Sequence, residues 1–211
     1  MKNTILEALN WRYATKIFDP SKKITDEDIH TVLESARLSP SSFGTEMWKF
    51  IVVENKDIRI KLREAGFDQP KITDSSHLII IAERTDIVEN ATKELIERIS
   101  RIENINPSNL DGLKNMLDGT ITQRQKDGSL ESWIKAQTYI PLGIMTETAA
   151  LLHIDTCSME GFMSDKVDEI LGLKEKNLKS VTMLSLGYRD EEKDTLRKKV
   201  RRDFDQVIEF I

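Results

Sequence analysis

Apolar residues recur along this chain with two different spacings, which predict helices alternating with strands. Positions three or four residues apart predict helices at 4–10, between Thr25 and Ser39, and at 56–65, 86–104 and 131–152. Apolar or β-branched runs predict strands at 50–53, 78–82 and 181–186, and residues 154–159 are predicted to be extended as well. Because the strands are separated by helices, the chain is predicted to be α/β or α+β.

Particular residue types mark where several of these helices begin and end. Thr25 is predicted to be an N-cap, with Asp28 three residues later as a weaker capping-box partner. Ser164 is predicted to cap a short helix that Gly172 ends. Pro141 lies inside the longest predicted helix and predicts a kink or a late start there. The apolar composition of that helix predicts burial on nearly all sides.

Two segments carry weaker patterns. Residues 107–130 are polar, and we expect only a short helix around 110–117. Residues 190–211 form a charged tail that ends on apolar side chains, namely Val207, Ile208, Phe210 and Ile211. An apolar end of this kind needs a docking surface, which could belong to the same domain or to a second subunit.

Composition narrows the class of protein. The chain has 211 residues, of which 39% are hydrophobic and 32% charged, as in ordinary globular domains. Its net charge of −5 disfavours a broad nucleic-acid-binding role. No apolar run is long enough to span a bilayer, and residues 1–10 lack a signal-peptide core. The single cysteine, Cys157, cannot form an internal disulfide, so a cytoplasmic location is predicted.

Two groups of cations are candidates for phosphate binding. Arg12 and Lys16 lie four residues apart just past the first helix. The planar guanidinium of an arginine can form two parallel hydrogen bonds to a phosphate, and the ammonium of a lysine can add a compact positive charge, so the pair could bind a phosphate. Spacing alone favours a solvated basic turn. The segment 197–202 has five cations in six residues and could bind a phosphate or a nucleic acid, or form a solvated face. The acidic balance of the chain and the lack of interleaved aromatic residues disfavour nucleic acid.

Two loops are candidates for ligand binding. Residues 39–44 combine hydroxyl groups with backbone N–H groups, although a plain helix-terminating loop is favoured on local grounds. In residues 158–162, Gly161 would allow the backbone to approach a flat ligand closely. A simple turn between a strand and a helix explains this second loop equally well.

Other reactive residue types point to no site. The three histidines are far apart and lack metal-ligand spacing, so structural roles are favoured for His30, His77 and His153. Cys157 lies in an apolar stretch without a CxxC partner, which favours inert packing. The chain has no G-x-G-x-x-G, Walker or G-x-S-x-G motif, so a Rossmann-type nucleotide site is not indicated.

The order of the motifs is more informative than any one of them. R-x-A-T-K-x-F-D near the start is followed by S-P-S-S, with a Trp six residues after the last Ser. Later come D-S-S-H-L-I-I-I, E-G-F, L-G-Y-R after a strand, and K-V-R-R. This ordered set resembles the nitroreductase family over most of residues 4–211, and most closely its oxygen-insensitive NAD(P)H nitroreductase and dihydropteridine reductase-like group.

The resemblance implies an architecture. The family has an α+β fold with a central, mainly antiparallel sheet flanked by helices, which makes residues 1–211 a single FMN-binding domain. It also forms an intertwined homodimer with two FMN sites at the subunit interface. The helix at 131–152 would form the core of the dimer. The tail at 190–211 would be a swapped arm that wraps the partner, and 86–130 would be a variable helical excursion over the active site.

The resemblance also implies a set of cofactor-binding residues, transferred position by position. Arg12 would hold the FMN phosphate, and Lys16 would lie near the pyrimidine edge of the flavin ring. Glu160 and Gly161 would present their backbone to flavin N5. The full cofactor-binding set is Arg12, Tyr13, Ala14, Lys16, Pro40, Ser41, Ser42, Asp68, Gln69, Ser158, Met159, Glu160, Gly161, Lys199 and Arg201. Pro40, Ser41 and Ser42 would reach the FMN of the other subunit, and Phe43, Phe67 and Lys71 are candidates for the substrate pocket.

The resemblance implies a chemistry in which the flavin does the redox work, so no catalytic triad is expected. A cation such as Lys16 near N1 and O2 would favour the reduced, negatively charged flavin. NAD(P)H would bind first and a small electron-poor acceptor second, in a ping-pong cycle. The expected acceptors are nitroaromatics or quinones. Flavin, pteridine or enone reduction is the alternative within enzymes, and a non-catalytic flavin-binding regulatory protein is the alternative outside them.

Two positions depart from the family pattern. Glu46-Met47-Trp48 stands where the family often has Gln-Pro-Trp. Asp68 stands where a flavin-contacting Asn is usual, and a carboxylate cannot donate a hydrogen bond as an amide does. We therefore expect either that Gln69 takes over this contact or that the loop is displaced. Both departures bear on nicotinamide and substrate preference more than on FMN binding.

Overall fold

Four antiparallel strands form the centre of the computed structural model, which describes residues 2–194 and 198–211. The strands are β1 (Trp48–Val52), β2 (His77–Arg84), β3 (Asp155–Met159) and β4 (Leu178–Gly187), and their order in the sheet is β1-β2-β4-β3. All three strand pairings are antiparallel. The four predicted strands are therefore confirmed, and the class is α+β.

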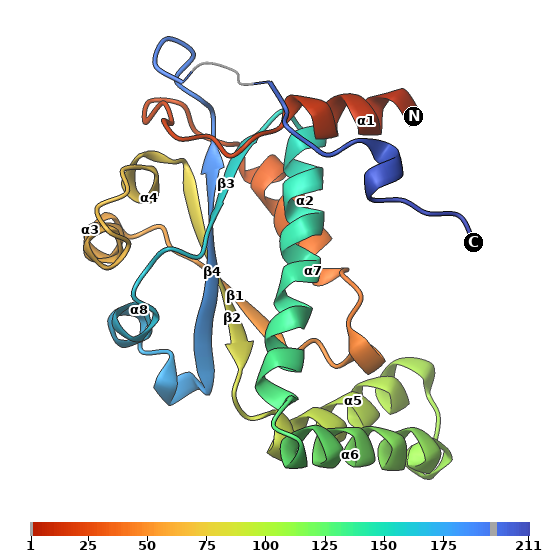
Figure 1. Cartoon of the computed structure of the whole chain (residues 1–211). Coiled ribbons are helices and arrows are strands. Elements are labelled where there is room, and N and C mark those ends of the chain that lie inside the picture. Colours follow the sequence, from red (N-terminus) through yellow and green to blue (C-terminus); the bar gives the residue numbers. More distant parts are fainter. Residues whose placement is uncertain (1, 195–197) are drawn as a thin grey trace.

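Helices cover both faces of this sheet (Figure 1). One face packs against α2 (Asp26–Arg37) and α7 (Leu130–Leu151), and the other against α3 (Lys56–Ala65), α4 (Lys71–Asp74) and α8 (Ser164–Leu171). Side chains of β2 alternate between these faces, as a strand requires: Ile79 and Ile81 join the α2–α7 core, whereas Leu78 and Ile80 join the α3–α8 core. Cys157 is buried in the second core, as predicted.

The remaining helices lie at the two ends of the sheet (Figure 1). The helix α1 (Lys2–Trp11) lies near the chain ends, and α5 (Ile87–Glu103) and α6 (Asp111–Lys126) project from the opposite end. Short 3-10 turns are η1 (Ser42–Gly44), η2 (Pro107–Leu110), η3 (Lys174–Lys176) and η4 (Phe204–Gln206). None of the helices in the described ranges is long and apolar enough to cross a membrane.

Several helix boundaries follow from the predicted capping residues. The Thr25 side chain accepts a hydrogen bond from the Asp28 amide and begins α2. Gly172 ends α8 in the left-handed conformation, with φ 57°. The predicted cap at Ser164 is wrong, because Met163 occupies the N-cap position. Ser164 instead donates a hydrogen bond to the Ser180 carbonyl (3.1 Å), which attaches the start of α8 to β4.

Three expectations about the longer helices are also wrong: the short extent of the helix near 110–117, the late start at Pro141, and the burial of 131–152 on nearly all sides. The polar segment around 110–117 extends into the 16-residue helix α6, because Leu117 and Ile121 pack against α5 and α7. The 22-residue helix α7 starts at Leu130 and runs through Pro141 without interruption. Its burial is one-sided rather than complete, since Ile140 and Leu151 remain 36% and 40% exposed. Ala136 and Gly143 extend the same exposed stripe.

The described part of the tail, residues 198–211, does not bury its apolar side chains in its own domain. Val200, Phe204 and Phe210 are 84%, 67% and 86% exposed. The only aromatic packing within this part of the chain is the stacking of Phe204 on Phe210, with ring centroids 6.5 Å apart. The structure thus disfavours docking of these residues on the same domain, which was one of the two alternatives.

Candidate functional site

Three predicted phosphate-binding cations come together in one chain, although they are far apart in sequence. The Lys199 ammonium donates hydrogen bonds to the carbonyls of Leu9 and Arg12, the latter across 2.5 Å. Arg12 is half-buried, and its Nε has no hydrogen-bond partner in the described structure. Within residues 2–194 and 198–211, Arg12, Lys199 and Arg201 form no ion pair with a carboxylate. Arg197, at the start of the predicted basic run, lies outside the described residues.

The electrostatics of this cation cluster favour an anion. Burial lowers the pKa of Arg12, and the nearby positive charge of Arg201 lowers it further. Burial also lowers the pKa of Lys199, with added repulsion from Arg12 and Arg201. Like charges held together without a counter-charge raise the free energy of the site, and a phosphate dianion would offset this cost. The residues present therefore fit a phosphate group.

The segment that carries Arg12 is attached to β3 and to Asp194. Ala14 forms a parallel bridge with Thr156, and the Thr15 amide donates to the Thr156 carbonyl (3.1 Å). The backbone amides of Lys16 and Ile17 donate to the Asp194 carboxylate (2.6 and 3.0 Å). The Lys16 side chain is left exposed to solvent and free to meet a ligand.

A buried ion pair that sequence reasoning missed supports this segment. Arg189 and Asp155 are 7% and 4% exposed and form a two-pronged contact, with Nη2–Oδ1 and Nε–Oδ2 distances of 2.5 and 3.0 Å. The Arg189 guanidinium also lies over the rings of Trp11 and Tyr13, 4.4 and 4.7 Å from their centroids. The L-G-Y-R motif contains Arg189, but no local pattern indicated its partner.

The predicted N5-facing loop lies at the other end of β3. Glu160 and Gly161 are exposed, and a Cβ added at Gly161 would meet no atom within 4 Å. Gln69 donates from its side-chain amide to the carbonyls of Gly66 and Gly161, both at 2.9 Å. Of the two residues before this loop, Ser158 is exposed and Met159 is buried in the core. The loop thus offers an open backbone surface on which a flat ring could lie.

The departure at Asp68 has a structural explanation. Its carboxylate pairs with Arg63, with an Nε–Oδ1 distance of 2.6 Å, rather than turning toward Gly161. Gln69 is the residue that reaches the Gly161 backbone. Phe67 is 64% exposed beside it and is available to a substrate. Lys71 is only 9% exposed, and its ammonium forms no ion pair within the described ranges.

The third predicted segment, Pro40 to Ser42, lies far from the cation cluster within one chain. The Ser42 amide donates to the side chain of Gln137, near the start of α7 (2.8 Å). Trp11, next to the cluster, contacts His153 just past the end of α7, with ring centroids 5.3 Å apart. At 1.5 Å per residue, the part of α7 between Gln137 and Leu151 spans about 21 Å. One chain therefore does not unite these two parts of the predicted site.

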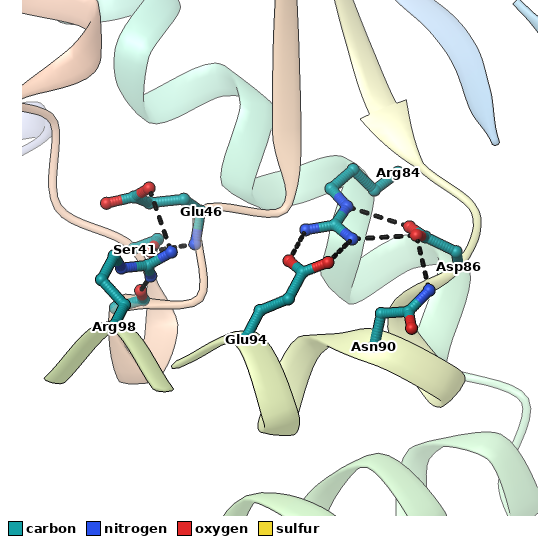
Figure 2. Close-up of polar contacts among 8 residues, drawn as sticks. Ser41, Glu46, Arg84, Asp86, Asn90, Glu94 and Arg98 are labelled. Atoms are coloured by element: carbon teal, nitrogen blue, oxygen red, sulfur yellow. Dashed lines mark hydrogen bonds and ion pairs between the residues drawn. The ribbon is translucent and has the colours of Figure 1, made fainter. Parts of the chain in front are cut away.

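The loop that follows Ser42 is held by α5 (Figure 2). Arg98 donates a hydrogen bond to the Gly44 carbonyl (2.7 Å) and lies 3.7 Å from the Glu46 carboxylate. The Ser41 hydroxyl accepts a hydrogen bond from the Glu46 amide (2.9 Å). Phe43 is partly buried against the α5–α6–α7 core, so it is less available to a substrate than Phe67.

A second network fixes the start of α5 on the end of β2 (Figure 2). Arg84 pairs with Asp86 and Glu94, with Nη2–Oδ2 and Nη1–Oε2 distances of 2.9 and 2.5 Å. Asp86 also accepts a hydrogen bond from Asn90 (2.9 Å). Both carboxylates raise the pKa of Arg84, so this guanidinium is charged at every relevant pH. In the described part of the chain, no group of three or more His, Cys, Asp or Glu residues is placed to hold a metal ion.

Comparison with known proteins identifies the family. The model of the nitroreductase family matches residues 9–188. The chain belongs to the nitroreductase family. A Staphylococcus haemolyticus protein named "Putative NAD(P)H nitroreductase" is 39% identical, with 100% of this chain and 99% of that protein covered. A Staphylococcus epidermidis protein with the same descriptive name is 38% identical, with 100% and 98% covered.

Solved structures with low sequence identity share the fold. A "putative nitroreductase" from Bacillus subtilis superposes with a TM-score of 0.87 at 21% identity, and both chains are fully covered. A "putative nitroreductase" from Exiguobacterium sibiricum, solved in complex with FMN, superposes with a TM-score of 0.83 at 20% identity, with 98% and 97% covered. The predicted nitroreductase-like α+β fold, with an antiparallel sheet between layers of helices, is confirmed.

Proposed function

We propose that this protein is an FMN-dependent NAD(P)H oxidoreductase that reduces small electron-poor acceptors such as nitroaromatics and quinones. The observation that carries the proposal is the cluster of Arg12, Lys199 and Arg201, which has no counter-charge in the described structure. Its relatives' names and the FMN complex of a structural neighbour support the same cofactor and electron donor.

The strand β3 separates two regions that suit the two ends of FMN. The cation cluster is attached at its start, near Asp155 and Thr156, and the open Glu160–Gly161 backbone follows its end. Five residues of extended chain at about 3.3 Å each span about 16 Å, so a phosphate and a flavin ring could occupy opposite ends. Arg12, Lys199 and Arg201 would hold the phosphate, and Gln69 would steady the backbone that faces the ring.

A second copy of the chain would complete the site. Within one chain Pro40 to Ser42 lie at the Gln137 end of α7, away from the cation cluster, and a symmetric partner could bring its own copy of this loop to the ring. The exposed stripe of α7, which includes Ile140 and Leu151, offers an apolar surface for such a partner. The exposed apolar side chains of residues 198–211 offer another. We therefore propose a homodimer with the tail packed on the partner.

The protein's contribution to the chemistry is positional and electrostatic. Bound FMN would supply the redox chemistry, accepting a hydride from NAD(P)H and passing electrons to the acceptor. Lys16 is exposed four residues after Arg12, and its long side chain, extended away from the phosphate end, would place a cation near the pyrimidine edge of the ring and stabilise negative charge on the reduced flavin. Donor and acceptor would use the same open face in turn, which defines a ping-pong cycle.

Anaerobic titration of the purified protein tests this function. The protein should be yellow or should take up added FMN, and NADH or NADPH should bleach the flavin band. Addition of a quinone or a nitroaromatic should restore the band. Steady-state rates at several donor concentrations should give parallel double-reciprocal lines. A colourless protein that also fails to bind added FMN would contradict the cofactor assignment, and bound FMN that neither nucleotide bleaches would contradict the activity.

A further inference from the structure

Glu83, near the end of β2, is a buried carboxylate with an unsatisfied oxygen. The residue is 4% exposed, and its Oε2 has no hydrogen-bond partner in the described part of the chain. A buried acceptor without a partner costs free energy, and a negative charge in such a place costs more. Nothing in the packing of the two cores requires a carboxylate here. The position therefore calls for a chemical explanation.

The obvious partner for Glu83 is engaged elsewhere. Lys179 on β4 lies directly opposite Glu83 in the strand register. Its ammonium instead bonds the carboxylate of Glu131 on α7, at 2.5 Å. Burial raises the pKa of Glu83 to about 6, and Glu131 and Asp168 add to this effect, while Lys179 and Lys135 oppose it. Glu83 can therefore hold a proton close to neutral pH.

A cavity connects Glu83 with the loop that faces the proposed flavin ring. The cavity has a volume of about 210 Å³ and is lined by residues of four segments, namely Glu83, Glu131, Lys135, Glu160, Phe162, Ser164, Lys179, Ser180 and Val181. Since a water molecule occupies about 30 Å³ of liquid volume, this space can hold several. Tyr139 lies close to Glu160 and Glu83. Burial raises the pKa of its phenol, and the negative charges of these two carboxylates raise it further.

We propose that Glu83 is a proton-holding residue that supplies, through this cavity, the proton consumed when the acceptor is reduced. This inference rests on the proposed function. Reduction of a quinone to a hydroquinone adds one hydride, which originates from NAD(P)H, and one proton. NAD(P)⁺ leaves, and the proton passes from the Glu83 carboxyl group along cavity water past Glu160 to the negatively charged oxygen of the reduced quinone, so that the quinone gains both H⁻ and H⁺ and Glu83 becomes a carboxylate. Solvent then returns the proton past Glu131 and Lys135, which line the same cavity and are exposed.

A carboxyl-carbon NMR titration of the purified protein tests the first half of the proposal without any measurement of activity. The Glu83 signal, assigned by its absence in Glu83→Gln, should titrate with a midpoint near 6. In Glu131→Gln, Lys179 loses its partner and can turn to Glu83, so the midpoint should move down by a unit or more. A Glu83 midpoint close to the ordinary value of 4.5 in the native protein would overturn the proposal.

Turnover with two acceptors tests the second half. With a quinone, Glu83→Gln should lose at least about tenfold in kcat near neutral pH and should lose the pH dependence set by this group. With ferricyanide, which takes electrons but no proton, the variant should match the native enzyme. Glu103→Gln, which removes an exposed carboxylate at the end of α5, is the matched control and should leave both rates unchanged. Quinone turnover in Glu83→Gln equal to that of the native enzyme at every pH would overturn the proposal.

The two experiments separate this inference from the proposed function. Failure to bind FMN would remove the proposed function, while the NMR midpoint would still show whether Glu83 holds a proton near neutral pH. Normal FMN binding and bleaching, with an ordinary Glu83 midpoint, would leave the function in place and remove only the role of Glu83.

Discussion

The guanidinium of Arg98 on α5 donates a hydrogen bond to the main-chain carbonyl of Gly44, across 2.7 Å (Figure 2). Gly44 lies in a strained turn, since Phe43 and Glu46 beside it have φ values of 57° and 50°, whereas glycine itself tolerates the φ of 73° found at Gly44. Left-handed backbone is costly for residues with a side chain, so neighbouring contacts must hold it. Arg98 thereby couples the helical excursion at 86–130 to the loop that Pro40 to Ser42 begin.

Replacement of Arg98 by Ala is expected to loosen this loop and to weaken FMN binding by up to about tenfold, because a charge-assisted hydrogen bond of about 1.5 kcal/mol no longer holds the loop in place and FMN binding must then order it. The helix α5 keeps its Arg84–Glu94 contact, so the protein should remain folded. Fluorescence titration of the flavin-free protein with FMN measures the change. Arg101→Ala, an exposed arginine on the same helix, should have native affinity. Equal affinities in the two variants would contradict this role for Arg98.

Replacement of Arg12 or Arg201 by Ala is expected to weaken FMN binding tenfold to a hundredfold, because a phosphate dianion loses a charged partner. The same change should leave the flavin-free protein as stable as before, or slightly more stable. The reason is that burial and mutual repulsion already lower the pKa of Arg12. Thermal unfolding with and without FMN separates the two effects. Arg202→Ala, a neighbouring exposed cation, serves as the control, and a large loss of stability without FMN would argue for a structural role instead.

Local patterns were sufficient to predict most elements but not their extent. Every predicted strand is present. The apolar runs of β1, β2 and β4 have few alternatives to a place between two layers of helices, whereas β3 mixes polar and apolar residues. The helix α6 was underestimated, since its polar sequence hides the few contacts, at Leu117 and Ile121, that stabilise it. A kink or a late start at Pro141 was predicted from the missing amide alone. The late start is wrong, because α7 begins at Leu130 and packing on the sheet keeps it helical through Pro141.

The candidate site was likewise only partly predictable from the sequence. The cations at Arg12, Lys199 and Arg201 were found through the order of motifs, and the structure brings them together. The partner of Arg189 was not found, because Asp155 is separated from it by 34 residues and has no local pattern. The sequence showed that Asp68 replaces the usual Asn, but it did not show where the Asp68 side chain would point. That orientation depends on whether Arg63 lies close enough to pair with it. Roles that need two chains stay predictions.

Replacement of Asp155 by Asn should destabilise the protein by about 3–5 kcal/mol, because Arg189 would keep a buried charge without a counter-charge. The Thr15 hydroxyl and the Arg189 amide, which also donate to this carboxylate, would lose a charged acceptor. Urea-induced unfolding measures the loss. Glu97→Gln breaks the exposed Lys93–Glu97 pair, whose atoms are 4.0 Å apart, and should change stability by about 0.5 kcal/mol or less. Similar losses in both variants would contradict a special role for the buried pair.

Replacement of Glu83 by Gln should stabilise the protein at neutral pH and not in acid. The folded-state pKa of Glu83, about 6, lies above the ordinary value of 4.5, so the folded protein holds this proton more tightly than the unfolded chain does. The contribution of the protonated Glu83 side chain to the free energy of unfolding is therefore fully present below pH 4.5 and is lost as the pH rises through 6. Above that pH the buried charge costs about 2 kcal/mol, which a neutral amide avoids.

Urea midpoints at pH 4.5, 5.5, 6.5 and 7.5 measure this dependence. The gap in the free energy of unfolding between Glu83→Gln and the native protein should grow between pH 4.5 and 6.5 and then level off. Glu103→Gln, which changes an exposed carboxylate, should show no such growth. A gap of constant size across the four pH values would show that Glu83 is ionised at its ordinary pKa. In that case a cation of the protein would neutralise the Glu83 carboxylate in solution, and both the predicted gain in stability of Glu83→Gln and the proton-holding role of Glu83 would be wrong.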